Sequence, residues 1–439
     1  MQGIKISVLI TIHNAEKYIK ECLDSVLAQT FSGIEILCID GGSTDMTPQI
    51  LQQYEKKDSR IRIINDSNTS YGHKVNRGIE EAEGEYICVL ESDDMYEAFM
   101  LEKLYEIVEM YHPDFVNGDY TCFFDVKGKR FKKVTKMYHE KDYNRLMENK
   151  KHPEEFGIIQ RYWTGIFKKE FLEREHIRMN ESPGASYQDM SFRFLTSILA
   201  DTSYHLDLPV YLYRVDNPGS SMYDSKKAEE IADEHDFLKG ELEKRGITDP
   251  YIWHNAYQWK YADFRGNMRH LNSVYRQVLF QRYRKELEKD REALSRYIDL
   301  GYNANVWEMI TGSPEIIAEK IESESEAEKE RRERIYGFLV KLIGLPDEQS
   351  LVIFGCGERG KAVLGYLCSG NMEKKLYCFT DNSEKFWNMR LNGYQILSPT
   401  EAVRTYGDAF YIIASKYYGD EIERQLRKLG IEEFNICRF

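Results

Sequence analysis

The residues best placed to do chemistry form a short acidic cluster at positions 91–94. Glu91, Asp93 and Asp94 directly follow one apolar segment, and Asp40 ends another. Carboxylates close together repel one another unless a cation or hydrogen-bond donors compensate, so such a cluster favours a divalent metal. Oxygen ligands suit Mg²⁺ or Mn²⁺ rather than Zn²⁺, and Mg²⁺ usually completes its shell with water and substrate phosphates. The alternative, which the motif alone would favour, is an acid-rich surface turn.

Alternating strands and helices are expected to position these acids. Four segments have the apolar patterning of buried strands, at residues 5–12, 34–40, 61–65 and 85–90. Asn14 is expected to cap the helix that follows the first of them. The alternation predicts an α/β fold with a parallel sheet and helices on both faces. Asp40 and the acidic cluster then fall beyond the carboxyl ends of strands, where ligands bind in such sheets.

The length of the chain predicts several domains. At roughly 100–200 residues per domain, 439 residues are expected to form about three. We divide the chain into a first domain with two halves, a helical segment and a small α/β domain, at residues 1–222 (halves 1–98 and 99–222), 223–345 and 346–439. The charge-dense run at 319–334 is expected to be a solvated helix or linker.

Composition excludes several classes of protein. The hydrophobic (42%) and charged (30%) fractions are typical of a folded globular chain. An excess of 73 acidic over 60 basic residues argues against a nucleic-acid partner. The first apolar stretch is too short for a signal peptide, and none suits a membrane-spanning helix. The eight cysteines form no C-x-x-C pair, which favours reduced thiols. We therefore expect a cytoplasmic protein, with peripheral contact at the inner face of the cell membrane as the alternative.

The order of motifs resembles the glycosyltransferases of family 2, which have the GT-A fold. The nucleotide-binding half is matched by KISVLITIHNAEKYIKECLDSVLAQT, IEILCIDGGSTD, YGHKVNRGI and GEYICVLESDD. Further matches to the acceptor half of bacterial polysaccharide-making members are TGIFKKEFL (164–172), SPGASYQDMSFRF (182–194) and YLYRVDNPGSSM (211–222). The resemblance covers about half of the chain. It implies an enzyme that transfers a sugar from a nucleotide-sugar donor.

The resemblance assigns the donor site to residues near the first three strands. Thr11 and Asn14 match the loop that lines the nucleoside pocket, and Asp40 matches the acid that hydrogen-bonds uracil. Lys74 and Asn76 lie in the segment that approaches the donor, where a cation could offset phosphate charge.

The resemblance also assigns the metal site and the base. Glu91, Ser92 and Asp93 occupy the D-x-D position, where Asp93 would bind Mn²⁺ or Mg²⁺ and Glu91 would approach the ribose. Asp189 matches the general base. A single base opposite the leaving diphosphate predicts inversion at the anomeric carbon, without a covalent intermediate.

Other matched residues concern the acceptor and a closing loop. Gln188 precedes the base, and Trp163 could stack on a sugar, although a core role is equally expected. Tyr213, Arg214 and the pair Ser220-Ser221 fall where a loop commonly closes over the pyrophosphate or acceptor.

Four positions depart from the family pattern. Thr11 replaces a proline, Gly41 an aspartate, Glu91 the first aspartate of D-x-D, and Gln188 the acid before the base. Because Asp93 and Asp189 are intact, these departures are expected to tune the site rather than abolish it.

The stretch 251–285 interleaves aromatic with basic residues. Such helices can rest on anionic membranes, but near-helical spacing of the aromatics favours packing inside the protein.

The C-terminal α/β domain carries a second motif. Gly355, Gly357 and Gly360 form a G-x-G-x-x-G that follows a strand and opens a helix, and Asp381 ends the next strand. The domain resembles the small Rossmann-like domains of sugar-modifying bacterial enzymes. A nucleotide or nucleotide-sugar site, or an interaction domain, is the expected role.

These observations predict an inverting, metal-dependent glycosyltransferase. It would use a nucleotide sugar, with UDP as the expected nucleotide, and a polysaccharide or lipid-linked oligosaccharide acceptor. One alternative is a bifunctional enzyme whose C-terminal domain also acts on a nucleotide sugar. The other is a non-catalytic nucleotide-sugar-binding protein.

Overall fold

A computed structural model describes residues 3–155, 161–219, 230–297, 308–309 and 311–439. Ser220 and Ser221 lie outside the described residues. The chain forms two compact units: unit 1 contains residues 1–121 and 134–325, and unit 2 contains residues 122–133 and 326–439. The division follows contacts alone, so the three-part division made from the sequence stays a prediction.

Unit 1 is built on a parallel sheet at its N-terminal end. The strands lie in the order β3 (Ile61–Asn65), β2 (Ile34–Asp40), β1 (Ile6–Ile12) and β4 (Tyr86–Glu91), all parallel. Every residue of β1 and β2 is buried, as expected of strands covered on both faces. The four strands predicted from the sequence are confirmed.

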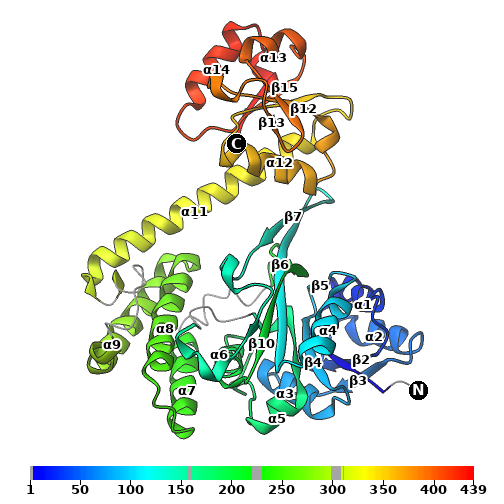
Figure 1. Ribbon diagram of the computed structural model, residues 1–439, viewed down its shortest axis with the longest axis vertical. Helices are drawn as coiled ribbons and strands as arrows, with labels where there is room; N and C mark the ends of the chain where they lie inside the picture. Colours follow the sequence, from blue (N-terminus) through cyan, green and yellow to red (C-terminus); the bar gives the residue numbers. More distant parts are fainter. Residues whose placement is uncertain (1–2, 156–160, 220–229, 298–307, 310) are drawn as a thin grey trace. The chain divides into compact units, whose positions relative to one another are not determined.

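Helices cover both faces of this sheet (Figure 1). They are α1 (Ile19–Leu27), α2 (Thr47–Glu55), α3 (Tyr71–Glu81) and α4 (Met100–Tyr111). Side chains alternate along β1, so Val8 and Ile10 join one core with Val26 of α1, while Leu9 joins another with Val75 of α3. The predicted α/β class with a parallel sheet is therefore confirmed.

Asn14 does not cap the first helix, which corrects the prediction. Helix α1 begins at Ile19, and its N-terminal cap position is held by Tyr18. Asn14 has a positive φ of 49°, and its Oδ1 accepts a hydrogen bond from the Thr44 amide at 2.8 Å. The side chain therefore joins two loops at the edge of the sheet instead of starting a helix.

The sheet of unit 1 continues with strands from the acceptor half. They are β9 (Gly165–Lys168), β6 (Phe115–Val126), β10 (Ser203–Arg214) and β5 (Met95–Tyr96), with β7 (Lys129–Thr135) and β8 (Leu146–Met147) paired beside β6 and β10. Strand β9 runs antiparallel to β4 and to β6. Two helices accompany them, α5 (Lys169–Arg174) and α6 (Asp189–Leu199).

A helical region completes unit 1. It consists of α7 (Glu230–Lys244), α8 (Pro250–His270), α9 (Ser273–Tyr297) and the start of α11 (Pro314–Ile343). Tyr257, Tyr261, Phe264 and Tyr283 from the aromatic-basic stretch are buried in its core. This packing supports the interpretation that the stretch faces the protein. Within the part of the chain that the structure describes, no helix has the length and hydropathy to cross a membrane.

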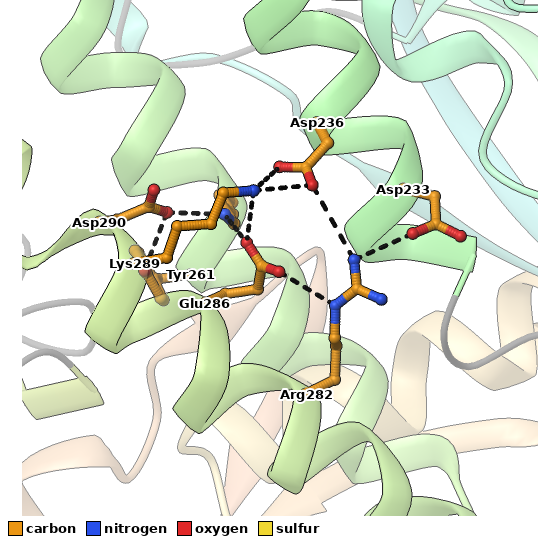
Figure 2. A network of polar contacts seen from close by, with 8 residues as sticks. Asp233, Asp236, Tyr261, Arg282, Glu286, Lys289 and Asp290 are labelled. Atoms are coloured by element: carbon orange, nitrogen blue, oxygen red, sulfur yellow. Dashed lines mark hydrogen bonds and ion pairs between the residues drawn. The ribbon is translucent and has the colours of Figure 1, made fainter.

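Buried charges join these helices (Figure 2). Lys260 of α8 contacts Glu286 at 2.8 Å and Asp290 at 2.6 Å, both on α9, and all three are at least nine-tenths buried. Arg282 extends the network to Asp233 of α7 at 3.0 Å. Removing Lys260, Glu286 or Asp290 would leave a buried charge without compensation, so these three residues hold α8 and α9 in a single arrangement.

Unit 2 has its own parallel sheet. The strands β14 (Tyr394–Leu397), β12 (Leu376–Thr380), β11 (Leu351–Phe354), β15 (Phe410–Ile413) and β16 (Ile436–Arg438) run parallel in this order, and β13 (Arg390–Leu391) pairs antiparallel with β14. Helices α12 (Glu358–Ser369), α13 (Pro399–Thr405) and α14 (Gly419–Lys428) accompany it. The predicted C-terminal α/β domain is present.

The core of unit 2 includes a hairpin from far earlier in the chain. The tip of β6 and β7, residues 122–133, belongs to unit 2. Phe131 is fully buried there, and its ring lies 6.5 Å from that of Tyr366 on α12. Val126 and Phe338 share the same core. Unit 2 is thus completed by residues about 200 positions before its main segment.

Phe131→Ala is expected to destabilise unit 2 by about 3–5 kcal/mol, because it opens a cavity in a closed core. The measurement is hydrogen exchange of β11, where protection should fall. Val134→Ala is the matched control, since Val134 lies near Phe131 on β7 but is 50% exposed. Equal protection in both variants would contradict a structural role for the hairpin.

Candidate functional site

Three of the predicted site residues lie at one edge of the parallel sheet. Thr11 of β1 stands in register with Glu91 of β4, and Asp40 of β2 stands beside Ile12. The Thr11 hydroxyl is 3.5 Å from Glu91 Oε2. Residues 80 positions apart are thus brought to the carboxyl ends of neighbouring strands, where the sequence predicted a ligand site.

The loop after β2 is fixed by short hydrogen bonds. Asp40 is buried, and its Oδ1 accepts from the Ser43 amide at 3.0 Å and from the Ser43 hydroxyl at 2.6 Å. Ser43 Oγ in turn accepts from the Asn14 amide at 2.8 Å. Among the described residues none donates to Asp40 Oδ2, so this oxygen remains able to accept a hydrogen bond from a ligand.

Lys74 occupies space that the small residue Gly41 leaves open. A Cβ at position 41 would lie 2.9 Å from Lys74 Nζ. Lys74 is buried, with only 5% of the residue exposed to solvent. Burial lowers its pKa, against the charges of Glu91, Asp66 and Asp40, which raise it. Gly41, one of the departures from the family pattern, therefore leaves the room that the Lys74 ammonium group occupies.

Glu91 is compensated by two tyrosines. Tyr71 donates to its Oε1 at 2.6 Å, and Tyr162 donates to the same oxygen. Burial raises the pKa of Glu91 to about 7, and the charges of Asp93 and Asp189 act in the same direction, whereas the tyrosine hydrogen bonds lower it. The sequence did not identify Tyr71 or Tyr162 as site residues. The sequence pointed to these two tyrosines only indirectly, because they lie close in the chain to the predicted site residues Lys74 and Trp163.

Asp94 serves the fold, which corrects its assignment as a further metal ligand. It is 1% exposed and accepts from Tyr211 Oη at 2.8 Å and from the Arg214 amide at 2.7 Å. Burial raises its pKa well above the usual range. Asp94 therefore joins the turn after β4 to β10 and is closed to a ligand.

Asp93 has the donor chemistry of a Mg²⁺ or Mn²⁺ site. It is half-buried, and Asn217 Nδ2 donates to its Oδ2 at 2.6 Å. Ser92 is half-buried in the same turn. Over the described ranges no three His, Cys, Asp or Glu side chains gather to hold a metal by themselves. A cation here would rely on Asp93, water and donor phosphates, which is the usual coordination of Mg²⁺, so the residues present fit it.

Arg214 is engaged with the protein in this conformation. Its Nε donates to the Asp93 carbonyl at 3.0 Å, its guanidinium pairs with Glu21, and it lies 4.6 Å above the Tyr18 ring. Arg214 therefore ties the acidic turn to the start of α1. Its direct contact with a donor stays a prediction.

Asp189 is the first residue of α6, and Arg193 donates to its Oδ2 at 3.1 Å. Its charge reaches Glu91, whose pKa it raises. The structure thus brings the predicted base into electrostatic range of the predicted D-x-D position. Gln188 is 1% exposed, and its Nε2 donates to the Ser182 and Gly184 carbonyls, at 2.8 and 3.0 Å. It shapes the loop before the base.

Trp163 is half-buried among other rings. It is stacked on Tyr213 at 5.3 Å between centroids, and Tyr120 meets it edge-on at 5.0 Å. These contacts give Trp163 a packing role, and a sugar contact stays a prediction.

The glycine motif of unit 2 is partly required by geometry. Gly355 has a φ of 116°, and a Cβ at Gly360 would lie 2.0 Å from the Gly355 carbonyl, whereas Gly357 faces open space. Asp381 accepts from the Cys356 amide at 3.0 Å and from the Ser383 amide at 2.8 Å. Both of its oxygens thus stabilise the loop, and a ligand contact stays a prediction.

Comparison with known proteins identifies the family. Residues 7–171 match the protein family described as Glycosyl transferase family 2. Residues 348–437 match a second family, described as C2185-like, N-terminal. Glycosyltransferase GlyG of Streptococcus pneumoniae is 31% identical over 218 residues, which are 48% of this chain and 70% of the relative. The chain therefore belongs to glycosyltransferase family 2, a family of transferase enzymes.

Other relatives and structures were also similar. The uncharacterized glycosyltransferase EpsJ of Bacillus subtilis is 30% identical over 49% of this chain, and the match covers 62% of EpsJ, so less than two thirds of that relative is spanned. Two solved structures show weak likeness. Staphylococcus aureus TarS 1–349 in complex with UDP has 20% identity and a TM-score of 0.41 over 70% of this chain and 90% of its own. The mannosyltransferase PcManGT of Pyrobaculum calidifontis, in complex with GDP-Man and Mn²⁺, has 15% identity and a TM-score of 0.43. The match covers 73% of this chain and 87% of PcManGT.

Asp94→Ala is expected to lower the free energy of unfolding by about 2–3 kcal/mol, because Tyr211 and the Arg214 amide lose a buried partner. Asp93→Ala, one residue earlier and half-buried, is expected to cost less than about 1 kcal/mol. Thermal unfolding of the two variants measures the difference. Equal losses would contradict the separate roles of these neighbouring acids.

Proposed function

We propose that this chain is an inverting, metal-dependent glycosyltransferase that moves a sugar from a UDP-sugar to a polysaccharide or lipid-linked oligosaccharide. The observation that carries the proposal is the strand register that brings Thr11, Asp40 and Glu91 together at the carboxyl ends of β1, β2 and β4. A displacement at an anomeric carbon needs a base and a charge-stabilising group on opposite sides of the reacting atom. Asp189 and Asp93 are candidates for these two roles.

The side-chain oxygen Oδ2 of Asp40 supports uracil as the nucleobase of the donor. Asp40 Oδ2 can accept the imide N–H of uracil, while Oδ1 is held by Ser43. Lys74, buried and near Asp40 and Glu91, can offset negative charge on the diphosphate. Thr11, Asn14, Ser92 and Arg214 stay proposed donor-site residues. Asn76, which the resemblance also placed there, has its side-chain amide bonded to Met179 and Glu181 and is not proposed to contact the donor.

The reaction has one displacement step. The acceptor hydroxyl attacks the anomeric carbon and gives its proton to Asp189, whose Oδ2 is oriented by Arg193. The new carbon–oxygen bond forms as the bond to the diphosphate oxygen breaks, and its electron pair leaves with the diphosphate. Attack opposite the leaving group inverts the anomeric configuration. A divalent ion bound at Asp93 would stabilise the negative charge of the diphosphate.

The acceptor side is proposed to include Trp163, and Gln188, which the resemblance also placed there, is proposed to act by shaping the loop before Asp189. Work at the cytoplasmic face of a membrane would give the enzyme access to a lipid-linked acceptor, and peripheral contact would suffice for it. The C-terminal residues Gly355, Gly357, Gly360 and Asp381 are proposed as a nucleotide-binding site in unit 2.

Asp189→Asn is expected to reduce transfer by about 10²–10⁴-fold and to leave donor affinity within about threefold, because the base is lost while the donor pocket is kept. A panel of nucleotide sugars, assayed for transfer and for binding by calorimetry, measures both. Asp201→Asn is the matched control, because Asp201 lies just beyond the other end of α6 with an exposed side chain. Donor binding without hydrolysis or transfer in the wild type, with Asp189→Asn making no difference, would instead favour the non-catalytic binding protein.

Chelation is expected to abolish transfer, and added Mn²⁺ to restore it, because the diphosphate would lose its compensating cation. Asp93→Ala should resist this restoration while it remains folded. Transfer that survives chelation would contradict metal dependence. A second activity that is lost on Gly357 or Asp381 substitution, with transfer intact, would favour the bifunctional enzyme.

A further inference from the structure

The segment that leads to the proposed base is fastened to helix α3. We name residues 177–188 the base loop, because Asp189 follows it directly at the start of α6. The Tyr71 amide, in the first turn of α3, donates to the Gly184 carbonyl at 2.7 Å. A Cβ at Gly72 would lie 1.9 Å from the Asn180 carbonyl oxygen, so α3 and the base loop approach as closely as a glycine permits.

The side-chain amide of Asn76 forms all of its hydrogen bonds with the base loop. Its Oδ1 accepts from the Met179 amide at 2.9 Å, and its Nδ2 donates to the Met179 carbonyl at 3.0 Å and to Glu181 Oε1 at 2.8 Å. Both donor hydrogens and the acceptor oxygen are used, and the residue is only 4% exposed. In this conformation Asn76 therefore fixes the backbone of the loop rather than facing a ligand.

His73 adds a second connection on the same helix. Its Nδ1 lies 2.9 Å from Glu181 Oε2, and its Nε2 lies 3.0 Å from Asp66 Oδ2. Asp66 is itself fixed just beyond β3, where its amide donates to the Asp40 carbonyl at 2.9 Å. Two carboxylate partners require two donors, and only the protonated imidazole has a hydrogen on both nitrogens.

The other side of the base loop is held by different helices. Glu234 of α7 accepts from Asn180 Nδ2 at 2.9 Å and from Ser182 Oγ at 2.6 Å. The Tyr187 hydroxyl donates to Asn267 Oδ1 of α8 at 2.5 Å. Helix α3 packs on β1 and β2 through Val75, so its contacts tie the base loop to the donor half of the sheet, and Ile177 and Met179 of the loop share that core.

We propose that Asn76, His73 and Glu181 act as positioning residues, a clamp that sets the distance between Asp189 and the donor. This inference rests on the proposed function, since it assumes that Asp189 is the base. The clamp does not touch the reacting atoms. It acts through the loop, so its loss should lower the rate of transfer more than the affinity for the donor.

The clamp should weaken as the pH rises. The hydrogen bond with Glu181, followed by the charges of Glu181 and Asp66, raises the pKa of His73 against the effect of burial. Arg77 is the further charged neighbour, acting on Asp66. For a raised pKa, the stabilisation is complete below the unfolded-state value and is lost as the pH rises through the folded-state value. Protonation of His73 therefore closes the clamp, and deprotonation releases one of its two carboxylates.

The clamp can be tested on the full chain with exchange, binding and turnover together. Asn76→Asp would set a carboxylate against Glu181, and adding Glu181→Gln would restore a donor to that pair. We expect faster hydrogen exchange of residues 177–188 in Asn76→Asp, a roughly tenfold lower kcat, donor affinity within about twofold, and substantial rescue in the double variant. Glu80→Gln, on the exposed side of α3, is the control. Loss of donor binding without rescue would overturn the clamp.

His73→Gln tests the pH dependence. The wild type should exchange the base loop faster, after correction for intrinsic rates, at about pH 9 than at about pH 6, and His73→Gln should remove this difference. His139→Gln, an exposed histidine, is the control. An unchanged pH dependence in His73→Gln would overturn the switch.

Exchange separates the two possible failures, because it needs no turnover. If the loop loosens in Asn76→Asp while its kcat equals that of the wild type, the positioning role is overturned and the proposed function stands. If the wild type transfers no sugar while the exchange results hold, the proposed function fails and the positioning of a base fails with it.

Discussion

The arrangement of unit 1 depends on how one half-buried carboxylate, that of Glu91, is compensated. Burial raises its pKa to about 7, and Tyr71 and Tyr162 donate to the same oxygen. Tyr71 begins α3 and also donates its amide to Gly184, while Tyr162 precedes Trp163 in the acceptor half. Compensation of a single acid thus joins the sheet, helix α3, the base loop and the acceptor segment. A shift in any of these parts would change the environment of the acid.

Three neighbouring acids after β4 have three different environments. Glu91 meets tyrosines, Asp93 is half-buried beside Asn217, and Asp94 is closed off by Tyr211 and the Arg214 amide. Glu91 ends β4, whereas Asp93 and Asp94 lie in the turn after it, so one short motif supplies a tuned acid, an accessible acid and a structural acid. Residue type alone does not separate these roles, because the distinction arises from what each side chain meets.

The sequence predicted the strands well because burial patterning is local, and β2 and β3 have the predicted bounds. Long-range partners explain the errors. Asn14 looked like a helix cap, but its side-chain oxygen accepts a hydrogen bond from the amide of Thr44, thirty positions away. Asp94 looked like a ligand because its partners are about 120 positions away. Likewise, Asn76 stood out near the donor segment, yet only the folded chain brings it against Met179.

The hairpin at residues 122–133 has a consequence for synthesis of the protein on the ribosome. Its apolar residues, with Phe131 among them, emerge roughly 200 residues before the segment that buries them. At about 5–20 residues per second, the nascent chain would carry this uncovered strand pair for roughly 10–40 s. During that interval it presents an apolar edge of the kind that chaperones bind. Unit 2 can close its core only after residues 326–439 have been synthesised.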